Sequence, residues 1–254
     1  MFRPIACSLT LAGLRNGHLA PAASFQAGLN TARVVGCAAV QLDGTEPGMR
    51  ARELDRSGRR DIAATLRRNG LTFTGIDMWV PESHFASTQH VDRAVEAVEQ
   101  ACGLAGELAR LVEGSGKPSV SFGLPAQVSR ELVSVLVSAA MRSGVVLADH
   151  NRAEAAGGTV LGIGFDPAVD ILSGRDVAGT AAMLAHLIND ARLTDASSRE
   201  RMVVGHGKLD VPAYKAVLRT VTELEHVVVD TRDRSDPVEA ARDAVNEWNA
   251  ADGA

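Results

Sequence analysis

The sequence has no excess of basic residues and no long apolar run. Its 26 Lys and Arg against 31 Asp and Glu give a net charge of -5 and a pI near 5.8. Nucleic-acid binding usually relies on long-range attraction to a basic surface, so we expect no nucleic acid among the partners. No apolar stretch approaches the roughly 20 residues that span a bilayer. The N-terminus also lacks a clear signal-peptide core, so we expect a soluble, cytoplasmic protein with no membrane partner.

Cysteines and several catalytic motifs are also scarce. The three cysteines, Cys7, Cys37 and Cys102, lie far apart in apolar segments and have no C-x-x-C spacing. This pattern predicts buried thiols instead of a disulfide or a metal site. The seven histidines add no Cys/His zinc cluster. The chain contains neither a G-x-x-x-x-G-K-[ST] phosphate loop nor a G-x-S-x-G nucleophile elbow.

Short apolar runs alternate with stretches of helical period along the whole chain, which is typical of βαβ units and a parallel sheet. The expected strands cover residues 5–9, 38–42, 71–80, 119–124, 145–148, 161–165, 188–194 and 226–230. The expected helices cover residues 25–35, 59–68, 88–111, 127–141, 176–186, 211–224 and 236–248. Eight strands in 254 residues match the usual size of one barrel, about 250 residues. We therefore predict a single (β/α)8 TIM barrel over residues 1–254.

One unit of this pattern is too short. Residues 151–159, which include Gly157 and Gly158, are all that separate the fifth and sixth strands. A parallel crossover with its helix normally takes at least about 10 to 12 residues. The fifth helix is therefore expected to be missing or reduced to a turn.

Two acids stand where apolar runs end, Asp149 after residues 145–148 and Asp166 after residues 161–165. Ligands of parallel α/β proteins bind beyond the carboxyl ends of the strands, so the two acids mark a candidate site. The alternative is that both simply begin the next loop, as Asp often does. Asp190, Arg192 and Thr194 share one face of the seventh strand, so their side chains are expected to point the same way.

Five segments together resemble the xylose isomerase-like TIM barrel family, which contains sugar phosphate isomerases and epimerases and also endonuclease IV. They are SGRRDIAATLRRNGLTFTGID (57–77), DRAVEAVEQACGLAGEL (92–108), FDPAVDILSGRD (165–176), RLTDASSRERMVVGHGKLD (192–210) and VVVD (227–230). They follow one another in the order of the family and are spread over most of the chain, from residue 57 to residue 230. The resemblance implies a TIM barrel, a small-molecule sugar or sugar phosphate as ligand, and a homo-oligomer as one option, since such barrels often pair.

The resemblance also implies a divalent metal, Mn, Mg, Co or Zn, held by Asp149, Asp166 and Asp230. The fourth position of this set, a His in the family, corresponds to Arg192. A guanidinium is always charged and has no lone pair to give a metal, so it would repel the ion. The sequence thus leaves two arrangements open, a metal held by shortened acids and a metal-free cluster of ion pairs around Arg192.

The remaining candidates are substrate contacts. Trp79 could provide a platform for a sugar ring, or could simply pack. His150 could reach a hydroxyl or phosphate, and the same holds for Arg152 and, less strongly, for His18; each could equally be an exposed loop residue. His206 stands in Gly205-His206-Gly207, where the family has Gly-Glu-Gly.

The resemblance implies a sugar or sugar-phosphate isomerase or epimerase. In such an enzyme Asp149 or Asp230 would transfer a proton next to a carbonyl, and Arg192 or a metal would stabilise the enediolate. The alternative is a catalytically inactive barrel with a carbohydrate-binding or structural role. Endonuclease-like cleavage needs several metals and a basic surface, and the sequence provides neither the histidine ligands nor the charge.

Overall fold

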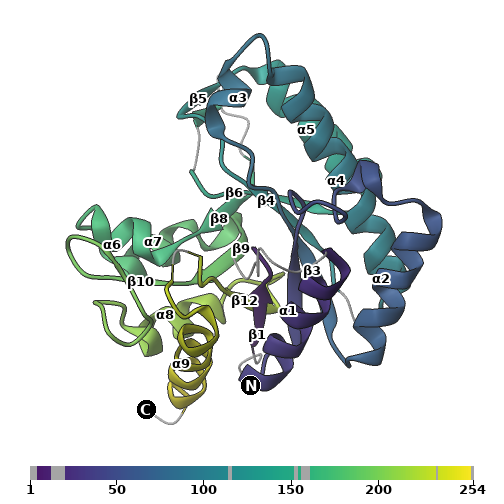
Figure 1. Ribbon diagram of the computed structural model, residues 1–254. Coiled ribbons are helices and arrows are strands. Elements are labelled where there is room, and N and C mark those ends of the chain that lie inside the picture. Colours follow the sequence, from purple (N-terminus) through teal and green to yellow (C-terminus); the bar gives the residue numbers. More distant parts are fainter. Residues whose placement is uncertain are drawn as a thin grey trace.

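The structure is a computed structural model that describes residues 5–12, 21–113, 116–151, 154–155, 161–232 and 234–252. Eight parallel strands close into a barrel in the order β1-β12-β9-β8-β6-β4-β3-β2 (Figure 1). The strands are β1 (Ala6–Thr10), β2 (Ala39–Asp43), β3 (Thr72–Asp77), β4 (Ser119–Phe122), β6 (Val146–Asp149), β8 (Ile163–Phe165), β9 (Ile188–Leu193) and β12 (His226–Val229). The predicted (β/α)8 barrel is confirmed.

Helices surround this barrel (Figure 1). They are α1 (Pro21–Val35), α2 (Arg56–Arg68), α3 (Glu82–Ala86), α4 (Val91–Leu111), α5 (Arg130–Ser143), α6 (Pro167–Leu172), α7 (Val177–Leu184), α8 (Val211–Leu218) and α9 (Pro237–Ala250), with 3-10 turns η1 (Ala51–Glu53) and η2 (Ala185–Leu187). The start of α9 is as predicted, because the Asp236 carboxylate accepts the N–H of Glu239 at 3.0 Å. No described helix is long and apolar enough to cross a bilayer.

Several predicted elements have different bounds. The third strand ends at Asp77 and not at residue 80. The helix predicted over residues 127–141 is α5, which starts at Arg130 and not at residue 127, because the Ser129 hydroxyl caps the N–H of Leu132 at 3.1 Å. The helix expected over residues 211–224 ends at Leu218, where the next turn is closed by a Thr220 hydroxyl that donates to the Val217 carbonyl at 2.7 Å.

Helix α6 was not predicted, although its start follows the same rule as that of α9. Asp166 accepts the N–H of Ala168 at 3.1 Å, and Pro167 occupies the first turn. Proline is favoured there because the first helical N–H groups have no partner within the helix. The same Asp-Pro pair thus begins both helices, so the sequence did contain a start signal for α6.

No helix lies between β6 and β8 among the residues that the structure describes. Instead the short strand β7 (Glu154–Ala155) pairs in parallel with β5 (Gln127–Val128). Residues 152–153 and 156–160 lie outside the described residues, so for them the reduced fifth helix stays a prediction.

The inside of the barrel is largely polar. The Gln41 amide of β2 donates to Asp190 of β9 at 2.7 Å, and the Ser119 hydroxyl of β4 donates to the same carboxylate at 2.7 Å. Neither β2 nor β4 neighbours β9 in the sheet, so both hydrogen bonds cross the barrel interior. Buried polar groups are costly unless they are paired, and these bonds connect opposite walls.

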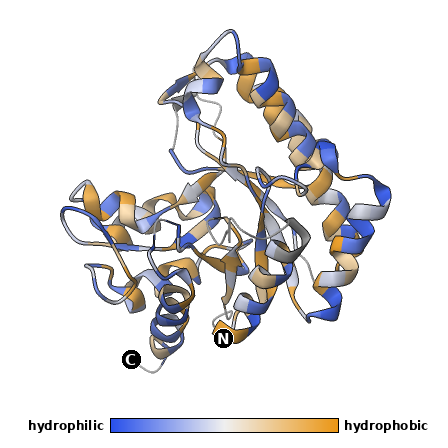
Figure 2. Ribbon diagram, in the orientation of Figure 1, coloured by the Kyte–Doolittle hydropathy of each residue, from blue (hydrophilic) through white to orange (hydrophobic). Residues whose placement is uncertain are grey.

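The apolar core lies mainly between the barrel and its helices. Along α4 and α5 the colours alternate between hydrophobic and hydrophilic residues, as expected for helices that separate core from solvent (Figure 2). The three cysteines are buried and free, which confirms the predicted buried thiols. Burial raises the pKa of the Cys7 thiol to about 12, with Lys215 acting weakly in the opposite direction.

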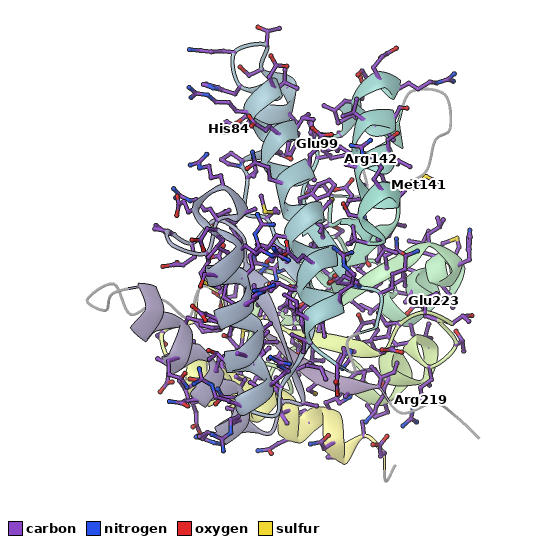
Figure 3. The ribbon with its side chains drawn as sticks, turned by 90° about the vertical axis from the view of Figure 1, so that its right-hand side faces the viewer. His84, Glu99, Met141, Arg142, Arg219 and Glu223 are labelled. Carbon is purple, nitrogen blue, oxygen red and sulfur yellow. The ribbon has the colours of Figure 1, made fainter. Side chains whose placement is uncertain are left out.

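Helices α4 and α5 run side by side and approach closely. The Arg142 guanidinium of α5 and the Glu99 carboxylate of α4 form an ion pair of 3.2 Å between the two helices (Figure 3). A Cβ atom at Gly106 of α4 would collide with the backbone carbonyl of Ser143. Only glycine allows this approach, whereas Gly103 on the same helix has open space around it.

The two glycines provide a matched test of this packing. Alanine favours a helix over glycine by about 1 kcal/mol, so Gly103→Ala is expected to stabilise the protein by up to about that amount. Gly106→Ala is expected to destabilise it by about 1–3 kcal/mol, because the added methyl group forces α4 and α5 apart. Urea unfolding followed by circular dichroism measures both changes. Stabilisation by both variants would contradict the close contact between the helices.

Candidate functional site

A cavity of about 410 Å³ opens at the carboxyl ends of the barrel strands. Its polar wall includes Asp77, Trp79, His150, Asp166, Arg192, Arg201, Asp230, Arg232 and Arg234. Five strands contribute to this set directly or through the residues that follow them. The position agrees with the usual place of ligand sites in (β/α)8 barrels.

Arg192 of β9 lies at the centre of this wall and is 4% exposed. Its Nη1 donates to Asp230 after β12, and its Nη2 donates to Asp77 of β3 at 3.1 Å. Its Nε donates to the Nε2 atom of His150 at 3.1 Å. Burial by itself lowers the pKa of a guanidinium, but the carboxylates of Asp77 and Asp230 outweigh this effect and raise the pKa of Arg192 above its ordinary value. The side chain is therefore a fixed positive charge.

Arg232 is a second cation on the same acids. Its Nη1 lies 3.0 Å from the Asp77 carboxylate, and its Nε donates to Asp230 at 2.9 Å. The guanidinium also covers the ring of Trp79, with Cζ 4.1 Å from the ring centroid. Trp79 is nevertheless 56% exposed and lines the cavity. Trp79, a predicted substrate contact, therefore lies at the mouth of the cavity and forms a cation–π pair with Arg232.

Asp230 combines burial with contact to both arginines. Burial raises the pKa of its carboxyl to about 6, against the lowering effect of Arg192 and with a further rise from Asp77 and Asp166. A carboxyl with such a pKa is ionised at neutral pH and can still take up a proton close to that pH. This is the behaviour that acid–base chemistry requires of a side chain.

His150 is buried against the backbone at Gly164, where a Cβ atom would overlap the imidazole ring. Burial, followed by the charge of Arg192, lowers the pKa of His150 to about 3. The imidazole is therefore neutral, and its Nε2 accepts from Arg192 as a neutral ring nitrogen can. The structure brings this predicted contact into the cavity wall, where it orients the guanidinium.

Asp190 and Arg192 of β9 and Thr194 directly after it point their side chains to the same side, as the alternation along a strand predicted. Asp190 lies deepest and binds Gln41 and Ser119, Arg192 follows at the level of the cavity, and the hydroxyl of Thr194 donates to Asp166 at 2.5 Å. Burial raises the pKa of Asp190 to about 6, although Arg192 lowers it.

Asp166 has no oxygen directed freely into the cavity. One oxygen accepts from Thr194 and from the N–H of Ala168, and the other accepts from Arg201 at 2.6 Å. Burial raises the pKa of Asp166, but the charge of Arg201 prevails and the net pKa lies below its ordinary value. The carboxylate thus ties β8 to Arg201 of the short strand β11 (Arg201–Met202).

Asp149 and His206 do not join the cluster around Arg192. The Asp149 carboxylate accepts the N–H groups of Leu124 and Asn151, both at 3.0 Å, and does not line the cavity. His206 is exposed and also lies outside the cavity wall. Their assigned roles stay predictions, as do those of His18 and Arg152, which lie outside the described residues.

Sequence reasoning missed Asp77 and the arginines beyond Arg192. Asp77 ends its strand as Asp149 does, so the same signal was present, but the predicted strand extended past it. Arg201, Arg232 and Arg234 lie in loops or at short strands, and no spacing marked them. The Gly205-His206-Gly207 loop is held by another missed residue, Asp195, whose carboxylate accepts the N–H of Gly207 at 2.8 Å and of Leu209 at 2.9 Å.

The side chains at the four positions implied for a divalent metal are not arranged to bind such an ion. Arg192 occupies the fourth position with a positive charge, and guanidinium groups bind Asp230 and one oxygen of Asp166. The other oxygen of Asp166 accepts from the Thr194 hydroxyl and the N–H of Ala168. Among the described residues no group of three or more His, Cys, Asp or Glu is placed to hold a metal ion. Of the two arrangements open from sequence, the ion-pair cluster is the one that these contacts form.

No protein-family model matches the chain, and no curated protein matches it. Solved structures resemble it over nearly its whole length. A xylose isomerase domain protein from Planctomyces limnophilus has a TM-score of 0.73 at 18% identity, over 100% of this chain and 97% of that one. An L-ribulose 3-epimerase has a TM-score of 0.74 at 14% identity, over 98% of this chain and 96% of that one.

A third structure, a xylose isomerase-like TIM barrel protein from Mycobacterium smegmatis in complex with magnesium, has a TM-score of 0.73 at 14% identity. The two structures match over 99% of this chain and 98% of that one. These likenesses concern the backbone, and the low identities leave the side chains of the mouth free to differ. The chain therefore has the fold of the xylose isomerase-like TIM barrel proteins, which sugar epimerases also have.

Proposed function

We propose that the protein transfers a proton next to the carbonyl of a small sugar or sugar phosphate, as an isomerase or epimerase, and does so without a divalent metal. The observation that carries the proposal is the buried Arg192 guanidinium in direct contact with Asp230 at the wall of the cavity. It provides at one point a fixed positive charge and a carboxylate that titrates near neutral pH.

The two side chains would have complementary roles. In an isomerase, Asp230 removes the proton from the carbon next to the carbonyl and returns it to the former carbonyl carbon, while the hydroxyl proton of the first carbon moves to the former carbonyl oxygen. An epimerase needs, in addition, a second acid that protonates the first carbon from its opposite face. Arg192 has five N–H donors, of which three bind His150, Asp77 and Asp230. A remaining N–H can donate to the carbonyl oxygen as it becomes an enediolate. One donor of this kind is typically worth about 3–4 kcal/mol of transition-state stabilisation.

Binding would use the rim of the same cavity. Arg234 lines it and donates to the backbone carbonyl of Arg201 at 3.1 Å, and no carboxylate pairs with Arg234 among the described residues. This guanidinium is therefore the cation available to a phosphate or carboxylate of the substrate. The exposed part of Trp79 offers an apolar surface to a sugar ring.

A second candidate function, a catalytically inactive barrel that binds carbohydrate, rests on one observation. Asp230 accepts hydrogen bonds from Arg192 and Arg232 at the same time, so two cations stabilise the ionised form of this carboxylate. A carboxylate held in this way is a weak base unless the substrate displaces one of the guanidinium groups.

Solvent exchange separates the two candidates without knowledge of the product. Aldoses, ketoses and their phosphates are incubated with the protein in D2O and a chelator, and deuterium next to the carbonyl is measured by mass spectrometry. We expect at least one substrate to gain deuterium, and Asp230→Asn to slow the exchange by at least about 100-fold. Binding of a sugar in a calorimeter with no exchange for any substrate would support the inactive barrel and contradict the proposal.

The proton transfer should depend on pH in the manner of a base. Asp230 acts only when it is ionised, so kcat/KM is expected to rise with pH and to reach half its maximum near the pKa of about 6. Asp190 has a pKa of about 6 as well but does not line the cavity. The variant Asp190→Asn should therefore keep the midpoint, and a profile that is flat between pH 5 and 8 would exclude Asp230 as the base.

Arg192 should also stabilise the fold, because its removal leaves buried carboxylates without a counter-charge. Arg192→Met is expected to lower the free energy of unfolding at pH 7.5 by about 3–5 kcal/mol. Arg67→Met, an exposed residue on α2, serves as the control and should change it by less than about 0.5 kcal/mol. Urea unfolding gives both values, and similar small losses would mean that Arg192 does not balance the acids.

A further inference from the structure

A second cavity, of about 310 Å³, lies between the segment after β2, the segment 78–81 after β3, and helix α4. Met78, Trp79, Val80 and Pro81 line both this cavity and the one at the barrel mouth, so this segment is a wall of each. We propose that the second cavity binds an amphiphilic organic anion, a carboxylate or phosphate monoester with a short apolar body. This inference does not depend on the proposed proton transfer.

The floor of the cavity is apolar. Ile76 and Met78 form it on one side, and small residues of α4, Ala94, Ala97 and Ala101, form it on the other. Because these α4 positions carry only methyl groups, the helix leaves a space above β3 that larger side chains would fill. A volume near 300 Å³ is at the lower end of the roughly 300–1,000 Å³ typical of small-molecule sites.

The rim of the cavity is basic. Arg50, Arg52 and Arg93 line it together with His84, and none of the described residues that line it is an Asp or Glu. His84 lies beside the start of α4 and contacts the His90 ring at 4.8 Å between centroids (Figure 3). One acid stands beside these cations, because the Glu53 carboxylate pairs with Arg50 at 3.2 Å and lies 4.0 Å from Arg52. Three arginines against one carboxylate leave the rim with a net positive charge, although the chain has a net charge of -5, and such a wall raises the local concentration of anions.

Part of this rim is held in place before any ligand binds. The Nε of Arg50 donates to the Thr45 carbonyl at 2.9 Å, and its Nη1 donates to Glu53 at 3.2 Å. The adjoining turn η1 is attached to α4 through Arg59, which donates to the Ala51 carbonyl at 3.2 Å and to Glu107 at 2.7 Å. A rim that is already ordered costs little conformational entropy on binding.

The charge and the apolar floor together define the ligand. An inorganic anion would leave the floor uncovered, and a neutral apolar molecule would leave the net positive charge of the rim unbalanced. A carboxylate or phosphate on a short alkyl or aromatic body satisfies both, because guanidinium groups pair well with these anions and the body buries apolar surface.

Probes of one chain length and different charge test the site. Octanoate, octyl phosphate and octylammonium are titrated into the full chain at pH 7.5 in a calorimeter, below their critical micelle concentrations. At least one of the two anions is expected to bind about tenfold or more tightly than octylammonium, and the tighter anion identifies the head group. Equal binding of the cation, or no binding of either anion, overturns the proposal.

Variants locate the binding, since an anion could also enter the barrel mouth. Ala97→Leu fills the floor and is expected to abolish binding of the preferred anion, while Arg93→Gln should weaken it about tenfold. Arg110→Gln, an exposed residue of the same helix that lines neither cavity, should leave the affinity unchanged. Thermal unfolding verifies that each variant is folded. If the anion binds folded Ala97→Leu and Arg93→Gln as it binds the unaltered chain, the second cavity is not the site.

Discussion

The buried guanidinium of Arg192 is the constraint on which the mouth of this barrel depends. It joins β9 to β3 through Asp77, to β12 through Asp230, and to the end of β6 through His150. Removing charges from water is costly, and the cost is offset only where each charge finds a partner of good geometry. Because each of these partners lies at the end of a different strand, Arg192 fixes the relative position of the strand ends.

This interaction also decides which chemistry the mouth can support. A divalent ion needs lone pairs directed at one point, whereas Arg192 presents N–H donors and a positive charge there. The acids that a metal would use are bound to arginines or to backbone N–H groups. The backbone is that of the xylose isomerase-like barrels, so the fold is shared while the charge at its mouth is provided by a side chain.

Sequence patterns predicted the barrel well, because each buried strand is a short apolar run and helices of the right period separate the runs. They also placed Arg192 beside Asp190 and Thr194 on one strand face, since alternation is a local property. The partners across the barrel could not be predicted in the same way. Gln41 and Ser119 meet Asp190 only because the sheet closes, and Asp149 ends a strand as expected but binds backbone N–H groups.

The most direct test of this account is the metal content of the purified protein after incubation with Mn2+ and with Mg2+ followed by gel filtration, measured by elemental mass spectrometry beside Asp166→Ala. The account predicts no bound metal in either protein, because Arg192 holds the charge that an ion would carry. Metal at about one ion per chain that is lost in Asp166→Ala would contradict it, since ligation at this position requires the carboxylates to be released from their arginines.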